Sequence, residues 1–93
     1  NLFLFNTHLK LAEQDGKINT LQQQMKEDDE IIRLRPNIRQ AAEAKVANGT
    51  LTVTEMLREV TAESLARQTQ AHHKIELLMN IYQKKHLTNT HTH

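Results

Sequence analysis

Histidine and carboxylate side chains are the residues of this sequence best suited to metal or acid–base chemistry. The chain has six His and no Cys, so a zinc site could use only His and carboxylate ligands. His72 and His73 are adjacent and point to different sides of a helix, whereas His91 and His93 chelate weakly and only from an extended tail. Three or four converging ligands are needed for zinc. We therefore expect solvated histidines and neither a metal nor another cofactor.

Other chemical motifs are also missing. No nucleophile elbow, phosphate-binding loop or dinucleotide fingerprint occurs, and the two glycines of the chain are too few to build one. The acidic run at residues 26–30 is typical of a solvated helix face. Met56 and Met79 lie within apolar stripes at helical spacing, where methionine fills gaps in packing. The sequence thus predicts a protein that is not an enzyme.

The composition favours long helices over a thick globular core. The chain has 93 residues, of which 38% are hydrophobic and 3% aromatic, with a single Pro. A formal net charge of +1 gives no electrostatic reason to expect nucleic acid or an anionic membrane as partner. The longest apolar run, residues 2–5, is far shorter than the roughly 20 residues of a membrane span. Because the first residue is Asn, we expect either a piece of a longer protein or a processed product.

A signal that ends one helix, followed directly by a signal that starts another, predicts a helical hairpin. Asn48 and Gly49 readily accept the positive φ that ends a helix and reverses the chain. Thr52 and Glu55 then fit a capping box, in which each side chain bonds the backbone amide of the other residue. We predict a single all-α domain, a long antiparallel two-helix coiled-coil hairpin over residues 1–93. Its helices cover about 2–47 and 52–86, its turn 48–51, and residues 87–93 form a frayed tail.

Each predicted helix carries an apolar seam. In the first, Leu4, Leu11, Ile18, Leu21, Met25 and Ile32 recur at helical spacing, and the seam then moves to Ile31, Leu34, Ile38, Ala41 and Ala42. In the second, the seam comprises Val53, Leu57, Val60, Ser64, Ala71, Ile75, Leu78 and Tyr82, with a stutter before Ala71. A second stripe, Met56, Ala62, Leu65, Ala66 and Met79, predicts more than one packing neighbour.

Two residues of the first helix oppose a helical conformation. Gly16 costs about 1 kcal/mol relative to Ala in a helix interior. Pro36 removes a backbone donor and clashes with the preceding turn, at a cost of about 3 kcal/mol. Because the seam resumes on both sides of Pro36, we expect one continuous helix that is kinked there.

The predicted turn also places apolar side chains where the hairpin has little core. Leu51 and Val53 stand beside the tip, and exposed apolar residues at the end of a rod form a reasonable docking surface. The alternative is a hydrophobic staple, in which Leu51 packs onto Met56 inside the same chain. Both arrangements are compatible with each other.

The residues around the turn resemble the C-terminal repeat of TolC-like outer-membrane efflux proteins. In residues 41–57, small and charged helical residues lead to a Gly-containing turn, then to an apolar residue, a Thr and an acidic residue. The likeness continues in Ala66-Arg67-Gln68 and in residues 75–82, an Ile- and Leu-rich segment that ends in Tyr82. It covers most of residues 31–87. The chain resembles only the periplasmic coiled-coil hairpin of that family, without its membrane strands.

This resemblance implies a location, partners and a site. The family builds a trimeric outer-membrane channel whose α-helical barrel crosses the periplasm. By that likeness, the tip residues Asn48, Gly49, Thr50 and Leu51 dock the periplasmic adaptor protein and, through it, an inner-membrane pump. Glu55 corresponds to an acidic residue at the tunnel entrance and is the candidate gate. Arg58 replaces a second acidic residue of some members and weakens the case for an acidic ring.

Two other functions fit a helical hairpin. The first is the adaptor side of the same type of pump, whose tips carry an Arg-Leu pair, but Arg33-Leu34 lies far from the predicted turn. The second is a generic oligomerisation module without a transport role. Alone, the hairpin would leave an apolar face bare, so we expect a dimer or helical bundle of the isolated chain.

Overall fold

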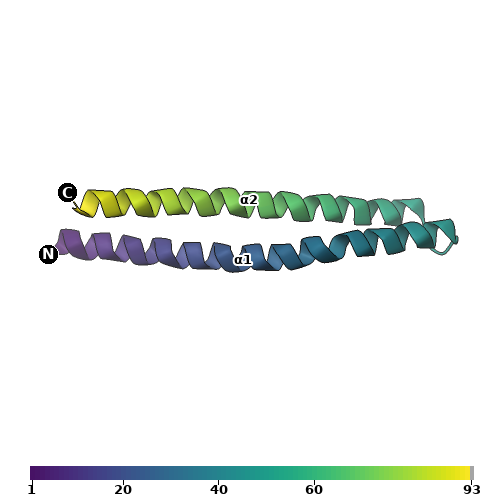
Figure 1. Cartoon of the computed structure of the whole chain (residues 1–93), viewed down its shortest axis with the longest axis horizontal. Helices are drawn as coiled ribbons and strands as arrows, with labels where there is room; N and C mark the ends of the chain where they lie inside the picture. The colour runs from purple at the N-terminus through teal and green to yellow at the C-terminus, as the bar shows by residue number, and fades with distance from the viewer. Residues whose placement is uncertain (93) are drawn as a thin grey trace. The chain divides into compact units, whose positions relative to one another are not determined.

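Two helices make up the protein (Figure 1). The computed structural model describes residues 1–92, and side chains as far as residue 89. α1 spans Leu2–Ala47 and α2 spans Val53–Thr92, and no strand occurs between residues 1 and 92. The helices run antiparallel, which confirms the predicted all-α hairpin. No helix in this part of the chain is long and apolar enough to cross a membrane.

The chain divides into two compact units, each with a segment of both helices. The turn unit comprises residues 26–71, and the terminal unit comprises Asn1–Met25 and the chain from His72 onward. In the terminal unit, Gln14 Nε2 donates to Gln83 Oε1 at 2.9 Å, and Lys84 Nζ lies 2.6 Å from Asp15 Oδ1. In the turn unit, ion pairs and hydrogen bonds join the helices in the same antiparallel sense.

α1 is continuous through Gly16 and Pro36, the two residues that disfavour a helical conformation. Asn1 caps its start, because Asn1 Oδ1 accepts a hydrogen bond from the Phe3 amide at 2.8 Å. Gly16 and Pro36 both lie inside the helix, as expected. Pro36 has no amide hydrogen, so the carbonyl of Ile32 loses its usual helical donor. The kink at Pro36 stays a prediction.

The expected end of the second helix near residue 86 is wrong. α2 continues to Thr92. Neither Gly nor Pro follows residue 86 to stop the helix, and Thr88 Oγ1 bonds the Lys84 carbonyl at 3.0 Å, which is compatible with a helical backbone. The predicted fraying of residue 93 lies outside the described residues.

The face of α1 that packs against α2 follows the first half of the predicted seam. Leu11, Ile18, Met25 and Ile32 are half-buried, and Leu21 is buried, whereas Leu4 is exposed. Beyond Ile32, the face of α1 that packs against α2 keeps the same heptad spacing, but polar or small residues occupy most of its positions. Besides Pro36, the shielded positions there are Arg35, Arg39, Ala42 and Val46.

The apolar residues to which the α1 seam was expected to move lie mostly on the outside. Ile31 is 44% exposed, Leu34 52% and Ile38 43%, and Ala41 is exposed as well. Ala42 alone of that group is buried. In the turn unit, the stripe of α1 that contains most of its apolar residues therefore does not pack against α2.

The apolar seam predicted for α2 also faces outward. Every large hydrophobic residue of that seam is exposed: Val53, Leu57, Val60, Ile75, Leu78 and Tyr82. The shielded positions instead include the more polar series Met56, Glu59, Glu63, Ala66, Gln70, His73, Leu77, Asn80, Lys84 and Leu87. These shielded residues recur in alternating steps of three and four, without a stutter. The predicted stutter therefore lies in the exposed apolar stripe of α2.

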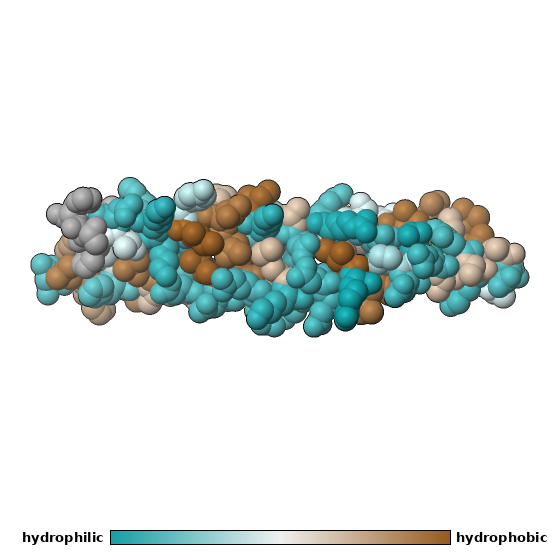
Figure 2. Space-filling view, in the orientation of Figure 1, coloured by the Kyte–Doolittle hydropathy of each residue, from teal (hydrophilic) through white to brown (hydrophobic). Residues whose placement is uncertain are grey.

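Little apolar surface is buried as a result. Among the described residues, only Leu21 and Ala42 are buried hydrophobic residues, while Thr7, Asp28 and Glu63 are buried polar ones. Apolar side chains reach the surface at several places along the face in Figure 2. The hairpin is thus polar at much of its helix–helix contact and apolar on much of its outside.

Candidate docking site at the hairpin turn

The turn is built by a Schellman motif at the end of α1. The Thr50 amide donates to the Lys45 carbonyl at 2.9 Å, and the Gly49 amide donates to the Val46 carbonyl at 3.0 Å. Gly49 has φ of +75°, the left-handed conformation that this motif requires. Thr50 Oγ1 also bonds the Lys45 carbonyl at 3.2 Å. These bonds satisfy carbonyls that a helix end leaves open, and they define the backbone conformation of the turn.

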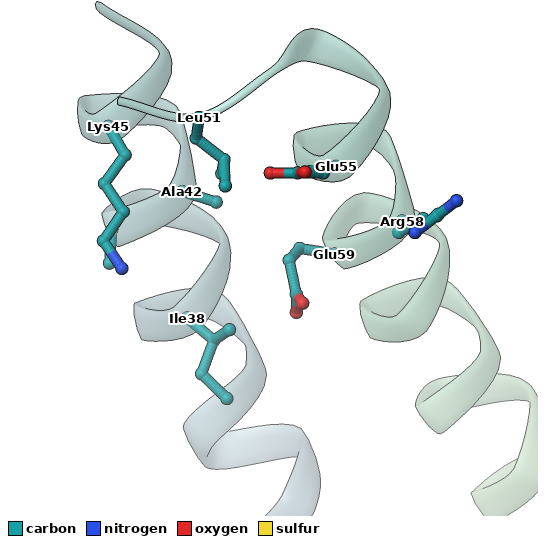
Figure 3. Close-up of a pocket in the computed structure, with 8 residues that line it drawn as sticks. Ile38, Ala42, Lys45, Leu51, Glu55, Arg58 and Glu59 are labelled. Carbon is teal, nitrogen blue, oxygen red and sulfur yellow. The ribbon is translucent and has the colours of Figure 1, made fainter. Parts of the chain in front are cut away.

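Thr52 caps the start of α2, as the sequence predicts. Its Oγ1 accepts a hydrogen bond from the Glu55 amide at 3.1 Å, and its carbonyl accepts from the Met56 amide at 3.1 Å. The other half of the predicted capping box is a bond from the Glu55 carboxylate back to the Thr52 amide. Glu55 makes no such bond in the described structure, and Figure 3 shows its carboxylate turned toward the space between the helices.

A groove opens between the helices next to the turn (Figure 3). Its volume is about 530 Å³, and Leu51 folds back from the turn to line it. Leu51 is half-buried there, which fits packing inside the chain as well as contact with a partner. The residues that line this turn groove are Ile38, Ala41, Ala42, Lys45, Leu51, Glu55, Arg58 and Glu59.

Four charged residues line the turn groove, and only one of them has an ion-pair partner among residues 1–92. Glu59 pairs with Arg35, with Oε2 and Nη1 at 3.4 Å. Lys45, Glu55 and Arg58 form no ion pair with any residue in 1–92. The intrahelical pair between Glu55 and Arg58, considered from the sequence, is therefore absent from this part of the chain. The turn groove thus combines apolar side chains with charges that have no ion-pair partner among residues 1–92.

The predicted tip residues are all accessible. Asn48, Gly49, Thr50 and Glu55 are exposed, and Leu51 is half-exposed. The structure brings Leu51 and Glu55 together in the turn groove, whereas Asn48 and Gly49 form the outer bend. The assignment of Glu55 as a gate stays a prediction.

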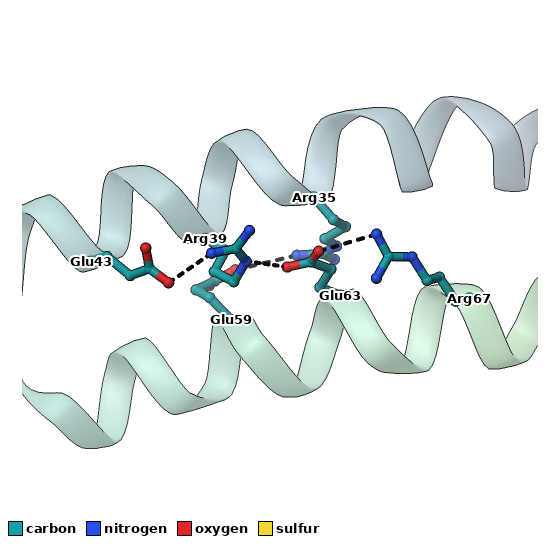
Figure 4. Close-up of polar contacts among 6 residues, drawn as sticks. All are labelled: Arg35, Arg39, Glu43, Glu59, Glu63 and Arg67. Carbon is teal, nitrogen blue, oxygen red and sulfur yellow. Dashed lines mark hydrogen bonds and ion pairs between the residues drawn. The ribbon is translucent and has the colours of Figure 1, made fainter.

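An ion-pair cluster between the helices was missed by the sequence analysis (Figure 4). Arg39 of α1 bonds Glu63 of α2, with Nε and Oε2 at 2.5 Å, and also bonds Glu43, with Nη1 and Oε1 at 2.7 Å. Arg67 Nη2 lies 3.3 Å from Glu63 Oε1. Arg35 and Glu59 complete the cluster. The Glu63 side chain is only 10% exposed, so it depends on these arginines for its hydrogen bonds.

Arg39 is the centre of this cluster. Its hydrogen bonds to Glu43 and to Glu63, and the negative charges of both carboxylates, raise the pKa of the Arg39 guanidinium above its ordinary value. The residue therefore stays charged at any physiological pH. A signal for the cluster was present in the sequence: two arginines four apart precede the turn, and two glutamates four apart follow it.

The remaining polar candidates are distributed along the helices. Part of the acidic run is not solvated, because Asp28 is buried; the exposed Asp29 accepts a hydrogen bond from Gln70 of α2. His72 Nε2 lies 2.6 Å from Glu76 Oε1 on the same helix. No group of three potential metal ligands occurs in the described part of the chain. The side chains of His91 and His93 lie outside the described residues.

Comparison of the chain with known proteins adds no family assignment. No protein-family model, no curated protein and no solved structure matches it.

Proposed function

We propose that this chain is a periplasmic wall segment of a TolC-like outer-membrane export channel. In this function it has no reaction of its own. Its outer faces pack laterally against further helical hairpins of the channel, which is a trimer. Its turn docks the periplasmic adaptor protein, which links the channel to an inner-membrane pump. The resemblance of residues 41–57, 66–68 and 75–82 to that family motivates the proposal.

The observation that carries the proposal is the inverted distribution of polar and apolar residues in the turn unit. Arg35 and Arg39 meet Glu59 and Glu63 at the contact between the helices. The larger aliphatic residues of the same segments face outward instead: Ile31, Leu34, Ile38, Val53, Leu57, Val60 and Leu65. A free-standing coiled coil places such residues inside and charges outside. The inverse arrangement suits a hairpin whose outer faces are covered by neighbouring helices.

The turn supports the docking part of the proposal. Its backbone is fixed by the Schellman motif and the Thr52 cap, so a partner meets a preorganised surface. Leu51 supplies a half-exposed apolar side chain, and Glu55 supplies a charge without a partner within residues 1–92. Gly49 carries no side chain at the outer bend, which permits close approach of another backbone.

Photo-crosslinking in cells tests the docking role. A photoreactive residue would replace Thr50 in the full-length protein that contains this hairpin, with Thr20 as the matched control. Both threonines are exposed, but Thr20 lies in the terminal unit. Capture of a periplasmic adaptor from position 50 and not from position 20 is expected. Recovery of self-crosslinked hairpins alone, with the protein properly assembled, would contradict the docking role.

A generic oligomerisation module is the second candidate. The terminal unit favours it, because this unit also exposes large apolar side chains far from the turn in sequence: Leu2, Phe3, Phe5, Leu9, Ile75, Leu78, Met79 and Tyr82. Such a module needs no adaptor, so the Thr50 experiment separates it from a channel segment. An adaptor-side hairpin has less support, because Arg33 and Leu34 lie on α1, well before the turn.

A further inference from the structure

A short patch formed by the turn and the start of α2 carries both charge signs without ion-pair partners among residues 1–92. Glu55 and Arg58 border the turn groove with Leu51, and Arg58 also lines an adjoining groove of about 380 Å³ with Ala62 and Leu65. Leu65 is 53% exposed. Within residues 1–92, neither Glu55 nor Arg58 forms an ion pair. We call Leu51, Glu55, Arg58, Ala62 and Leu65 the turn patch.

The order of residues in the turn patch makes it complementary to a second copy of itself. Leu51, Glu55, Arg58 and Ala62 follow one another in steps of four, three and four, in the order apolar, acidic, basic, apolar. Two α2 helices that cross antiparallel midway between residues 56 and 57 place each Glu55 opposite the other Arg58. Each acid then meets a base.

The side-chain directions fit such a contact (Figure 3). The Glu55 carboxylate is turned into the turn groove, and Leu51 lies beside it. Arg58 extends away from the groove, so its guanidinium projects from the molecule. In a two-fold pair, the projecting Arg58 of each copy meets the recessed Glu55 of the other.

The exposed area of the chain is also large enough to accommodate an interface. The accessible surface is 6961 Å². A compact monomer of 10.8 kDa exposes about 5,500 Å², so the excess is on the order of 1,400 Å². A stable interface of standard size covers roughly 800 Å² on each partner. The excess surface is thus sufficient for one such contact.

We propose that the isolated chain forms a two-fold symmetric dimer through the turn patch, with the α2 helices antiparallel. Such an interface is isologous, because the same residues contribute from both copies. The inference rests on the surface of this chain alone and does not depend on the assignment to an export channel.

Charge reversal and mixing test the dimer on the full 93-residue chain. Glu55→Arg places two bases opposite each other at both charge contacts, and Arg58→Glu places two acids there. Each variant alone is expected to dimerise at least about tenfold more weakly than the parent chain. An equimolar mixture of the two variants restores opposite charges, so it forms a heterodimer with parent-like affinity. Sedimentation equilibrium and energy transfer between labelled chains measure both effects.

Two controls separate the contact from a folding defect. Glu30→Arg makes the same charge reversal at an exposed position of α1 and should leave the dissociation constant of the dimer unchanged. Circular dichroism checks that each variant keeps the parent helix content. A parent chain that stays monomeric at about 1 mM overturns the proposal. So does a dimer that neither reversal weakens, or a mixture that associates no better than the separate variants.

Discussion

Replacement of Gly49 by Ala isolates the backbone contribution of the turn. Gly49 has φ of +75°, and a Cβ atom placed there meets no other atom within 4 Å. A loss of stability in the Gly49→Ala variant therefore arises from the conformation and not from a clash. The left-handed conformation costs an L-residue about 1–2 kcal/mol. The lower entropy of the unfolded Ala chain offsets about 0.4–1 kcal/mol of this.

The net expectation is a destabilisation of about 1 kcal/mol. For a domain of this length, that lowers the Tm by about 4–8 °C. Gly16→Ala is the matched control, because Gly16 lies inside α1 and a Cβ atom there also meets nothing within 4 Å. Here Ala is the better helix former, and a rise in stability of about 1 kcal/mol is expected.

Thermal unfolding followed by circular dichroism at one fixed chain concentration measures both variants. Replacement of Gly49 by D-alanine in a synthetic chain provides a second control, because a D-residue favours positive φ. This chain should be at least as stable as the parent. Equal Tm values for the parent and Gly49→Ala would refute the assignment of a left-handed Schellman turn.

Three further substitutions address other parts of the structure. Arg39→Met removes the main partner of the buried Glu63 carboxylate and should lower the free energy of unfolding, measured in urea, by about 1–3 kcal/mol. Arg33→Met, at an exposed site of the same helix, should change this free energy little. A loss at position 39 no greater than at position 33 would contradict a stabilising cluster. Thr52→Ala removes the α2 cap and should cost about 1 kcal/mol of unfolding free energy, and an unchanged value would exclude that role. Pro36→Ala restores a helical donor and should raise the Tm through a gain of up to about 3 kcal/mol; a lower Tm would contradict this.

The turn and the helix type were predictable because their signals are local. Positive φ at Gly49 and the side-chain cap at Thr52 depend on residues within one helical turn of each other. The long helices follow from the near absence of Gly and Pro. The end of α2 was placed too early because the loss of an apolar seam after residue 86 does not by itself stop a helix.

The packing face was less predictable because it depends on which neighbour covers each stripe. The seam of Val53, Leu57 and Val60 is apolar, yet these residues are exposed and the heptad that meets α1 contains Glu59 and Glu63. Periodicity locates an apolar stripe but does not identify the helix against which the stripe packs. Charge patterning was the missing information, because the arginines of α1 and the glutamates of α2 define the pairing.

In the assembled full-length protein, we expect other helices to cover the outward apolar stripes. Thiol labelling of Ile38→Cys and of its neighbour Asn37→Cys tests this coverage. Both residues are exposed in this hairpin, so both thiols should react in the isolated chain. In the assembled protein, the thiol at position 38 should be protected at least about tenfold relative to the thiol at position 37. Equal labelling of the two positions in the assembled protein would show that no helix covers this stripe.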